Sequence, residues 1–188
     1  MTTETLSRTA PVDHAILEVL AERWSPRAFT DDPVDPAAVD RFLEAARWAP
    51  SCANSEPARF LVAHRGTESF DKIVATMAEG NQAWAPRAGV LIAALAKDVS
   101  PYASYDLGQA VAHLSIQAHA DGLYVHQMAG FSAEGLSAAF ELGADLTPTT
   151  LIAVGHLDSP EVLAEPYQSR ETAERVRSPQ SELVLLRH

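Results

Sequence analysis

The chain has few of the residues that staple small secreted domains or build multi-cysteine metal centres. It contains a single cysteine, Cys52, among 188 residues, which excludes an internal disulfide and any site with several cysteine ligands. Its longest apolar run, residues 90–96, is far shorter than the roughly 20 residues that cross a membrane. The first residues, MTTETLSRTAPVDH, have no apolar core and do not resemble a signal peptide. These absences predict a cytoplasmic protein without a membrane partner.

Lysine is almost absent as well: there are only Lys72 and Lys97, against twelve arginines. The formal net charge is −11, and a charge of this sign repels nucleic-acid backbones, so no nucleic-acid partner is expected. Arginine presents a planar fork that binds phosphate or carboxylate oxygens in pairs, which lysine cannot do. Ordinary surface salt bridges would also explain the excess of arginine, so the positions of these residues must decide.

Sequence motifs of several common enzyme classes are missing. There is no GxGxxG after a strand, no GxxxxGK[ST], no GxSxG and no HExxH, so a Rossmann dinucleotide fold has no support. His113 and His119 are six residues apart on one predicted helix and point to different faces. No metal site is therefore predicted.

The pattern of apolar residues predicts one α+β domain spanning residues 1–188, with helices around a small, mostly antiparallel central sheet. Helices are expected over 13–22, from Pro36 to the stop at Pro50, over 67–77, over 105–120 with Gly122 just after its end, and from 132 to about 142. Asp35, Thr67 and Ser132 are the predicted N-caps. Strands are expected at 60–63, 90–96, 123–127 and 151–155.

The two ends of the chain are predicted to differ from its centre. Residues 1–12 are predicted to be flexible, and residues 160–188 to form a tail that engages a dimer partner. The tail is polar and irregular from about Pro166 onward and closes with the apolar run LVLL at 183–186. An apolar end after a polar stretch needs a surface that covers it, and a partner subunit is one solution.

Two arginine pairs occupy opposite ends of the sequence. In an extended loop, residues two apart point the same way, so Arg23, Ser25 and Arg27 can converge on one ligand. Arg175 and Arg177 repeat this spacing near the other end. A small anionic ligand would explain both pairs, and solvated surface arginines remain the alternative for either pair alone.

Around these pairs stand several further segments in a fixed order. Together with the RWSPR loop at 23–27 they resemble the FMN-dependent nitroreductase family, and the resemblance spans about residues 19–185. The segments are EAARWAPSCANSEPARF (44–60), GNQAWAP (80–86), YDLGQA (105–110), ADGL (120–123), MAGF (128–131), AVGH (153–156), and RVRSP with ELV (175–179 and 182–184). The chain departs from the family pattern at Cys52, Glu56, Ala58 and Ala129, which leaves room for acceptors other than nitroaromatic compounds.

The resemblance implies that FMN is bound and supplies hydride chemistry. It places Arg23, Trp24 and Ser25 at the phosphate and ribityl chain, with Arg175 and Arg177 closing on the phosphate. Arg27 would approach the N1/O2 edge of the flavin ring, where reduction places negative charge. Arg27 and Gly130 are the residues to which the resemblance assigns a catalytic role.

The remaining implied contacts come from the middle of the chain. Asn81 would hydrogen-bond the pyrimidine portion or the ribityl chain, and the loop of Met128, Ala129 and Gly130 would offer a backbone N–H to flavin N5. Pro50, Ser51, Cys52 and Asn54 would reach the flavin of the partner subunit, which makes the active site a property of a homodimer.

Several of these residues have plainer interpretations. Pro50 and Asn54 could simply end the second helix, Asn81 could be a turn residue, and Gly130 a bend. Trp24, Trp48 and Trp84 fit the core or a dimer contact, Cys52 an inert packed thiol, and His126 a structural histidine.

The function that the resemblance implies is a homodimeric FMN oxidoreductase. NAD(P)H and then a small-molecule acceptor, such as a nitro compound or quinone, would react in turn by a ping-pong scheme. Two alternatives stay open: a flavin-binding protein for storage or sensing with little turnover, and an FMN-dependent oxidase or dehydrogenase of a small metabolite.

Overall fold

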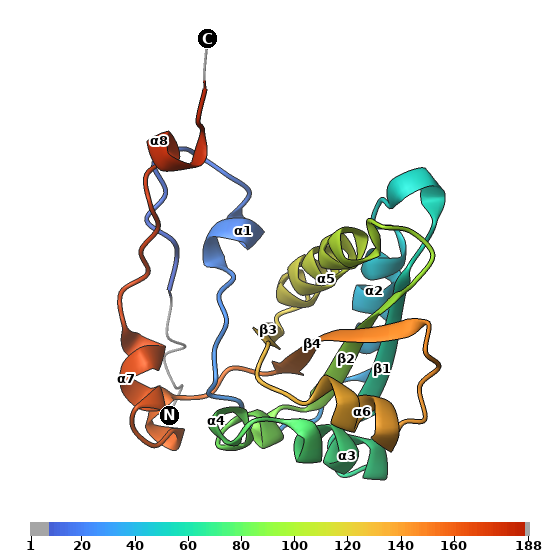
Figure 1. Cartoon of the computed structure of the whole chain (residues 1–188). Helices are drawn as coiled ribbons and strands as arrows, with labels where there is room; N and C mark the ends of the chain where they lie inside the picture. The colour runs from blue at the N-terminus through green and yellow to red at the C-terminus, as the bar shows by residue number, and fades with distance from the viewer. Residues whose placement is uncertain (1–7, 187–188) are drawn as a thin grey trace.

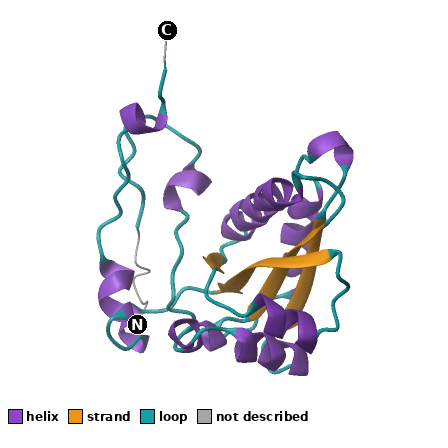
Figure 2. Ribbon diagram, in the orientation of Figure 1, coloured by secondary structure: helices purple, strands orange, loops and turns teal. Residues whose placement is uncertain are grey.

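The centre of the molecule is a four-stranded sheet with helices on both faces (Figures 1 and 2). The computed structural model describes residues 8–186. The strands are β1 (Ala58–His64), β2 (Val90–Lys97), β3 (Tyr124–Met128) and β4 (Leu146–Gly155), in the order β1-β2-β4-β3. Every neighbouring pair is antiparallel. The predicted α+β fold with a small antiparallel sheet is confirmed.

Strand β2 lies in the middle of two apolar layers. Its apolar residues are buried throughout the strand, which explains why they form a continuous run instead of alternating with polar ones. Helices α2 (Pro36–Arg47) and α5 (Ala103–Ala120) cover one face of the sheet. Helices α3 (Glu68–Thr76) and α6 (Ala133–Ala139) cover the other, with the short α4 (Glu79–Gln82) beside them (Figure 1).

The predicted helix caps are present. Asp35 accepts a hydrogen bond from the Ala37 N–H at 3.0 Å, and Ser132 accepts one from the Gly135 N–H at 2.9 Å. The Thr67 hydroxyl accepts one from the Phe70 N–H at 3.3 Å. These bonds satisfy backbone donors that have no partner within the first turn of a helix. Gly122 follows α5 with a φ of +79°, as a residue after a helix often does.

Two elements differ from the sequence prediction. Helix α1 covers only Glu18–Glu22, not 13–22, and Ile16 and Leu17 are exposed. Because these two side chains stay largely exposed, burial does little to stabilise an earlier start of the helix. Strand β4 begins at Leu146, not at 151, and its first residues include Pro148. Proline is tolerated there because the pairing register shifts beside it, between Ala94 and Leu95.

The tail contains more helix than predicted. It carries α7 (Tyr167–Thr172) and α8 (Gln180–Leu183), and it runs beside the N-terminal segment that carries α1 (Figure 1). Single 3₁₀ turns occur at Cys52–Asn54, Ala85–Arg87 and Pro160–Val162. Leu183 and Leu185 are 80% and 95% exposed, and their burial by a partner subunit stays a prediction.

At the N-terminus, residues 1–7 lie outside the described range, where the expected flexibility stays a prediction. Residues that follow them make specific contacts. The Ala10 N–H donates to the Ala21 carbonyl at 2.8 Å, and the Arg8 guanidinium lies 4.6 Å from the centre of the Trp24 ring. Between residues 8 and 186, no helix combines the length and the apolar character needed to cross a membrane.

Candidate functional site

The loop of residues 23–28 is held by side chains from distant parts of the chain. The Arg175 guanidinium donates to the Arg23 carbonyl at 3.0 Å. Glu171 accepts hydrogen bonds from the N–H groups of Arg27 and Ala28, at 2.7 and 2.9 Å. A ring nitrogen of His126, on β3, lies 2.9 Å from the Pro26 carbonyl. The backbone of this loop is therefore fixed by the tail and by the edge of the sheet.

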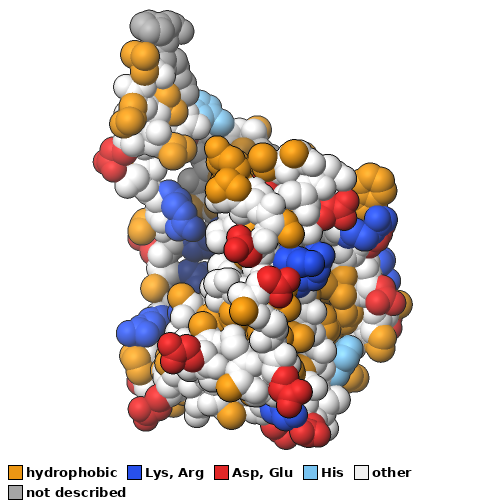
Figure 3. Space-filling model, turned by 45° about the vertical axis from the view of Figure 1, so that its right-hand side comes forward, with side chains coloured by type: hydrophobic (Ala, Val, Ile, Leu, Met, Phe, Trp, Pro, Cys, Tyr) orange, Lys and Arg blue, Asp and Glu red, His pale blue; other side chains and the backbone are white. Residues whose placement is uncertain are grey.

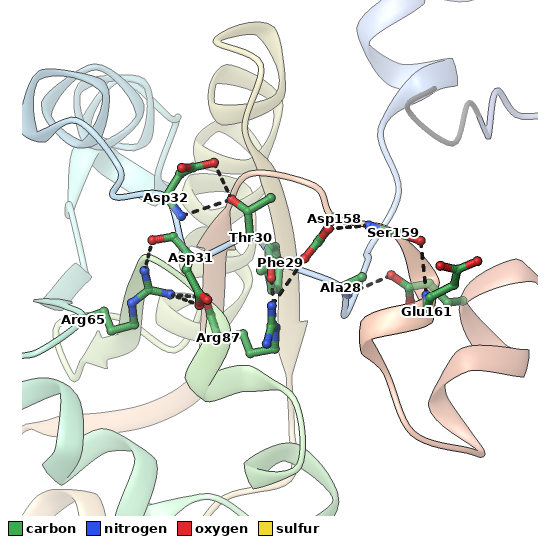
Figure 4. Close-up of polar contacts among 11 residues, drawn as sticks. Ala28, Phe29, Thr30, Asp31, Asp32, Arg65, Arg87, Asp158, Ser159 and Glu161 are labelled. Atoms are coloured by element: carbon green, nitrogen blue, oxygen red, sulfur yellow. Dashed lines mark hydrogen bonds and ion pairs between the residues drawn. The ribbon is translucent and has the colours of Figure 1, made fainter. Parts of the chain in front are cut away.

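The residues after the loop are anchored just as firmly. Arg87 donates to the Phe29 carbonyl at 3.0 Å and lies 3.3 Å from the Asp158 carboxylate (Figure 4). Arg65 donates to the Arg87 carbonyl and pairs with Asp31. Arg65 and Arg87 are thus structural residues, and they account for part of the arginine excess. These contacts fix the backbone on the C-terminal side of the loop.

Three arginines of the two predicted pairs gather without acidic partners, whereas the fourth, Arg27, faces Glu171. Among residues 8–186, Arg23, Arg175 and Arg177 form no ion pair. Burial lowers the pKa of Arg23, and the nearby charge of Arg177 lowers it further. Burial also lowers the pKa of Arg175, helped by Arg23, Arg177 and Arg8. Figure 3 shows basic side chains gathered in a hollow between the tail and the rest of the molecule. Like charges held together in this way favour an anion among them.

A small cavity of about 30 Å³ adjoins the Arg23 end of this cluster. Ser25, whose side chain makes no hydrogen bond within the described residues, lines it together with Arg23 and His119. The Nδ1 atom of His119 is buried and has no hydrogen-bond partner there. Trp24 also lines this cavity, but its ring is 7% exposed and packs edge-on against Tyr124, which suits the interpretation as a core contact. His119 was not among the predicted site residues.

Arg27 extends from the loop toward Trp84. Its guanidinium carbon lies 5.8 Å from the Trp84 ring centre, and one of its nitrogens lies 3.9 Å from Glu171. The His126 ring lies 4.5 Å from the same tryptophan. Burial lowers the pKa of His126 to about 4, with the bond to Pro26 opposing this and the charge of Arg27 adding to it. At neutral pH His126 is therefore uncharged and donates its Nδ1 proton to Pro26.

Asn81 and Gly130 are in direct contact with each other. The Gly130 carbonyl accepts from the Asn81 side-chain amide at 2.9 Å and from the Ala78 N–H at 2.9 Å. A Cβ atom added to Gly130 would lie 2.9 Å from the Asn81 amide nitrogen, so a larger residue here would displace the Asn81 side chain. The preceding Met128 is buried, and its carbonyl accepts from Thr150; Ala129 follows it in the same turn. The loop predicted to meet the flavin edge is thus built on Asn81.

The segment from Pro50 to Asn54 lies apart from these residues, at the opposite end of the molecule (Figure 1). Asp106, at the start of α5, is 4% exposed and accepts from the Cys52 N–H at 3.0 Å. Ser51 accepts from the Glu56 N–H, and Asn54 donates to the Glu56 carboxylate. A cavity of about 380 Å³ lies behind this segment, between α2, β1 and α5. One chain alone does not bring the segment to Arg23.

Arg175 and Arg177 differ in how many of their guanidinium donors bond backbone carbonyls. Arg175 donates to the carbonyls of Arg8, Ala21 and Arg23, so it ties the tail to the loop. Within the described part of the chain, the Arg177 guanidinium makes one hydrogen bond, to the neighbouring Val176 carbonyl. Within residues 8–186, no group of three His, Cys, Asp or Glu side chains is arranged to hold a metal ion.

This architecture is that of a known family. Residues 20–156 match the model of the Nitroreductase family, and the chain belongs to that family. A candidate NADH dehydrogenase/NAD(P)H nitroreductase of Streptomyces coelicolor is 28% identical over 159 residues, which cover 71% of this chain and 78% of the relative. An uncharacterised 15.4 kDa protein of Mycolicibacterium smegmatis is 33% identical over 132 residues, 63% of this chain and 88% of that protein.

Solved structures show the same similarity in three dimensions. A crystal structure described as an oxidoreductase containing FMN has a TM-score of 0.89 and 30% identity, with 96% of each chain covered. A candidate nitroreductase from Desulfovibrio desulfuricans, solved in complex with FMN, has a TM-score of 0.76 and 28% identity. That match covers 94% of this chain and 99% of the other.

Proposed function

We propose that the protein is an FMN-dependent oxidoreductase in which Arg23, Arg175 and Arg177 hold the phosphate of the cofactor. The observation that carries this proposal is a cluster of partly buried arginines with no acidic partner in residues 8–186. Holding like charges together costs free energy unless an anion sits among them. The two similar structures whose descriptions include FMN support this choice of anion.

The groups around the cluster fit a phosphate ester. A hydrogen bond from a charged donor to phosphate contributes about 1.5–3 kcal/mol, and Arg23 and Arg177 have most of their donors available. Ser25 and His119 line the adjoining cavity, where the Ser25 hydroxyl can bind a polar chain that extends from the phosphate. Arg175 mainly aligns the other two, because its own donors are used on backbone carbonyls.

Arg27 and Gly130 would serve the ring of the cofactor. Bound FMN would supply the hydride chemistry. Arg27 would place a positive charge at the ring edge that becomes more negative on reduction, and a fixed charge favours that form. Gly130 would let the backbone of residues 128–130 approach the ring closely, because it has no side chain. Asn81 keeps that backbone in place through its bond to the Gly130 carbonyl.

A second copy of the chain would complete the site. Pro50, Ser51, Cys52 and Asn54 lie away from Arg23 and Arg27 in one chain, so they can reach the same ligand only from a partner. The exposed apolar residues Leu183 and Leu185 of the tail offer a surface for such a partner. NAD(P)H and a small-molecule acceptor would then occupy the shared pocket in turn.

The simplest test is the colour and reactivity of the purified protein. It should be yellow, or take up added FMN, and NAD(P)H should bleach it in the absence of oxygen. A colourless protein that ignores FMN would refute the proposal. Stable yellow colour in the presence of NAD(P)H would instead identify a flavin-binding protein without this activity.

A matched pair of variants tests the arginine cluster. Arg23→Ala should raise the Kd of FMN at least tenfold, because it removes charged donors worth more than about 1.4 kcal/mol. Arg41→Ala is the control, since Arg41 is exposed, pairs with Asp121 and does not line the cavity beside Arg23. Equal FMN affinity in both variants would exclude Arg23 from the phosphate site.

A further inference from the structure

Glu171 is the most deeply buried carboxylate among the described residues, and sequence analysis assigned it no role. It lies on α7 in the tail and is 1% exposed. Placing a carboxylate in such surroundings is costly unless hydrogen bonds or a nearby positive charge compensate. Its position therefore calls for an explanation in terms of its contacts.

The two oxygens of Glu171 do different things. Oε1 accepts both backbone bonds of the loop, from Arg27 at 2.7 Å and from Ala28 at 2.9 Å. Oε2 is buried and has no hydrogen-bond partner among residues 8–186; the Arg27 guanidinium lies 3.9 Å from it. One side chain from the tail thus fixes the backbone of Arg27 and also faces the charged end of Arg27.

The charge of Glu171 affects the pKa of Arg27. Burial lowers the pKa of Arg27, the charge of Glu171 raises it again, and the charge of Arg170 lowers it. A cation 3.9 Å from an anion acts on a third group partly as a dipole, so its field is weaker than that of a lone charge. The Arg27 side chain is still 24% exposed and can reach a ligand.

We propose that Glu171 is a positioning residue that holds the Arg27 loop and reduces the positive charge that Arg27 presents to the flavin. This inference rests on the proposed FMN function. It makes the tail part of the control of the cofactor: Glu171 sets the direction of Arg27 through Oε1 and tunes its electrostatic effect through the charge on Oε2.

Two substitutions separate these effects. Glu171→Gln keeps an oxygen that can accept the Arg27 and Ala28 bonds but removes the negative charge. It should strengthen binding of reduced FMN relative to oxidised FMN about tenfold, which corresponds to a rise of about 30 mV in the two-electron potential. Glu171→Ala removes both effects and should also weaken FMN binding. Glu174→Gln, an exposed glutamate of the same tail, is the control and should leave the potential unchanged.

The potential is measured by anaerobic spectroscopic titration of the holoenzyme against a reference dye. If the Glu171→Gln potential equals that of the wild type and of Glu174→Gln, charge tuning by Glu171 is refuted. A purely structural residue would change the melting temperature without moving the potential. A wild-type chain that binds no FMN would overturn the proposed function instead.

The positioning role has its own readout, which needs no cofactor. In the wild-type apoprotein, the amide hydrogens of Arg27 and Ala28 should exchange slowly with solvent. Glu171→Ala should increase their exchange at least tenfold, and Glu174→Gln should not. Fast exchange of these amides in the wild type, or unchanged exchange in Glu171→Ala, would overturn the positioning role even if the substitutions reduce stability.

Discussion

The side-chain amide of Asn81 donates a hydrogen bond to the Gly130 carbonyl at 2.9 Å, and a methyl group on Gly130 would meet that same amide nitrogen at 2.9 Å. The two residues come from α4 and from the turn after β3, 49 positions apart. The two residues are coupled, because a side chain at position 130 would displace the Asn81 amide that bonds the Gly130 carbonyl.

Gly130→Ala should therefore damage both stability and cofactor binding. Crowding of this kind costs about 1–3 kcal/mol, which for a chain of this size lowers the melting temperature by roughly 2–4 °C per kcal/mol. FMN affinity should fall about tenfold or more as Asn81 moves. Thermal melts and FMN titrations measure both effects.

The matched control is Gly108→Ala on α5. An added Cβ there has nothing within 4 Å, and alanine favours a helix over glycine by about 0.8–1 kcal/mol. This variant should melt at the same temperature as the wild type or higher. Equal behaviour of the two alanine variants would contradict the steric role of Gly130.

The arginine cluster should bind inorganic phosphate even without FMN. For the apoprotein, phosphate at ten times its Kd should stabilise the fold by about 1.4 kcal/mol, following ligand linkage. The melting temperature should rise with phosphate but not with sodium chloride of equal ionic strength. Arg23→Ala should lose this rise, whereas Arg41→Ala should keep it. A rise that persists in Arg23→Ala would place the anion elsewhere.

His126 should make the protein sensitive to acid over a defined range of pH. Its pKa is about 4 in the fold and near 6.5 in the unfolded chain. Because the folded pKa is the lower one, the unfolded state takes up a proton first as the pH falls. The contribution of the neutral His126 to stability is fully present above pH 6.5. The free energy of unfolding declines by about 3 kcal/mol as the pH falls to 4.

Urea unfolding between pH 4 and 7 measures this effect. His126→Gln, which retains a donor for the Pro26 carbonyl, should lose less stability over that interval than the wild type. His113→Gln serves as the control because His113, on α5, is not the histidine that bonds the Pro26 carbonyl. Parallel curves for His126→Gln and the wild type would contradict a buried neutral His126.

If the site is shared, two defective chains should complement each other. Arg23→Ala damages the site at the loop, and Cys52→Glu places a bulky charge on the segment expected to come from the partner; Cys52 is exposed, so this change spares the core. In a mixed dimer with two-fold symmetry, one site receives both defects and the other receives neither.

Coexpressed and separately tagged chains allow the mixed dimer to be purified. It should bind FMN at one intact site and regain NAD(P)H-dependent activity, although both parent homodimers are impaired. No recovery in a purified mixed dimer would mean that both defects act within one chain. A monomeric wild-type protein would rule out a shared site altogether.

Sequence patterns predicted helices and strands well where the signal depends on residues close together in the chain. The capping residues Asp35, Thr67 and Ser132 mark helix starts because their side chains bond amides two or three positions away. The apolar run of β2 indicates a buried strand for an equally local reason. The helix predicted from residue 13 was too long because Ile16 and Leu17 stay largely exposed and gain little from packing. The strand prediction missed the start of β4, because a proline such as Pro148 argues against a strand in the sequence.

The candidate site could be predicted only in part. The spacing of Arg23, Ser25 and Arg27, and of Arg175 and Arg177, indicated the basic cluster. Nothing near Glu171 in sequence suggested its role, because its partner Arg27 is 144 positions away. Likewise His126 and Pro26 are 100 positions apart. Single carboxylates and histidines are common, and only their three-dimensional neighbours distinguish them.

The amino-acid sequence by itself determined the family and the order of the main helices and strands, and it indicated the arginines proposed for the site. These depend on patterns between near neighbours and on an ordered set of motifs, both of which can be read along one chain. Only the tertiary structure decided which backbone groups Glu171 and Arg175 hold, and which acid faces Arg27. Those contacts arise where the tail meets the loop, and their geometry comes from the packing of the whole domain.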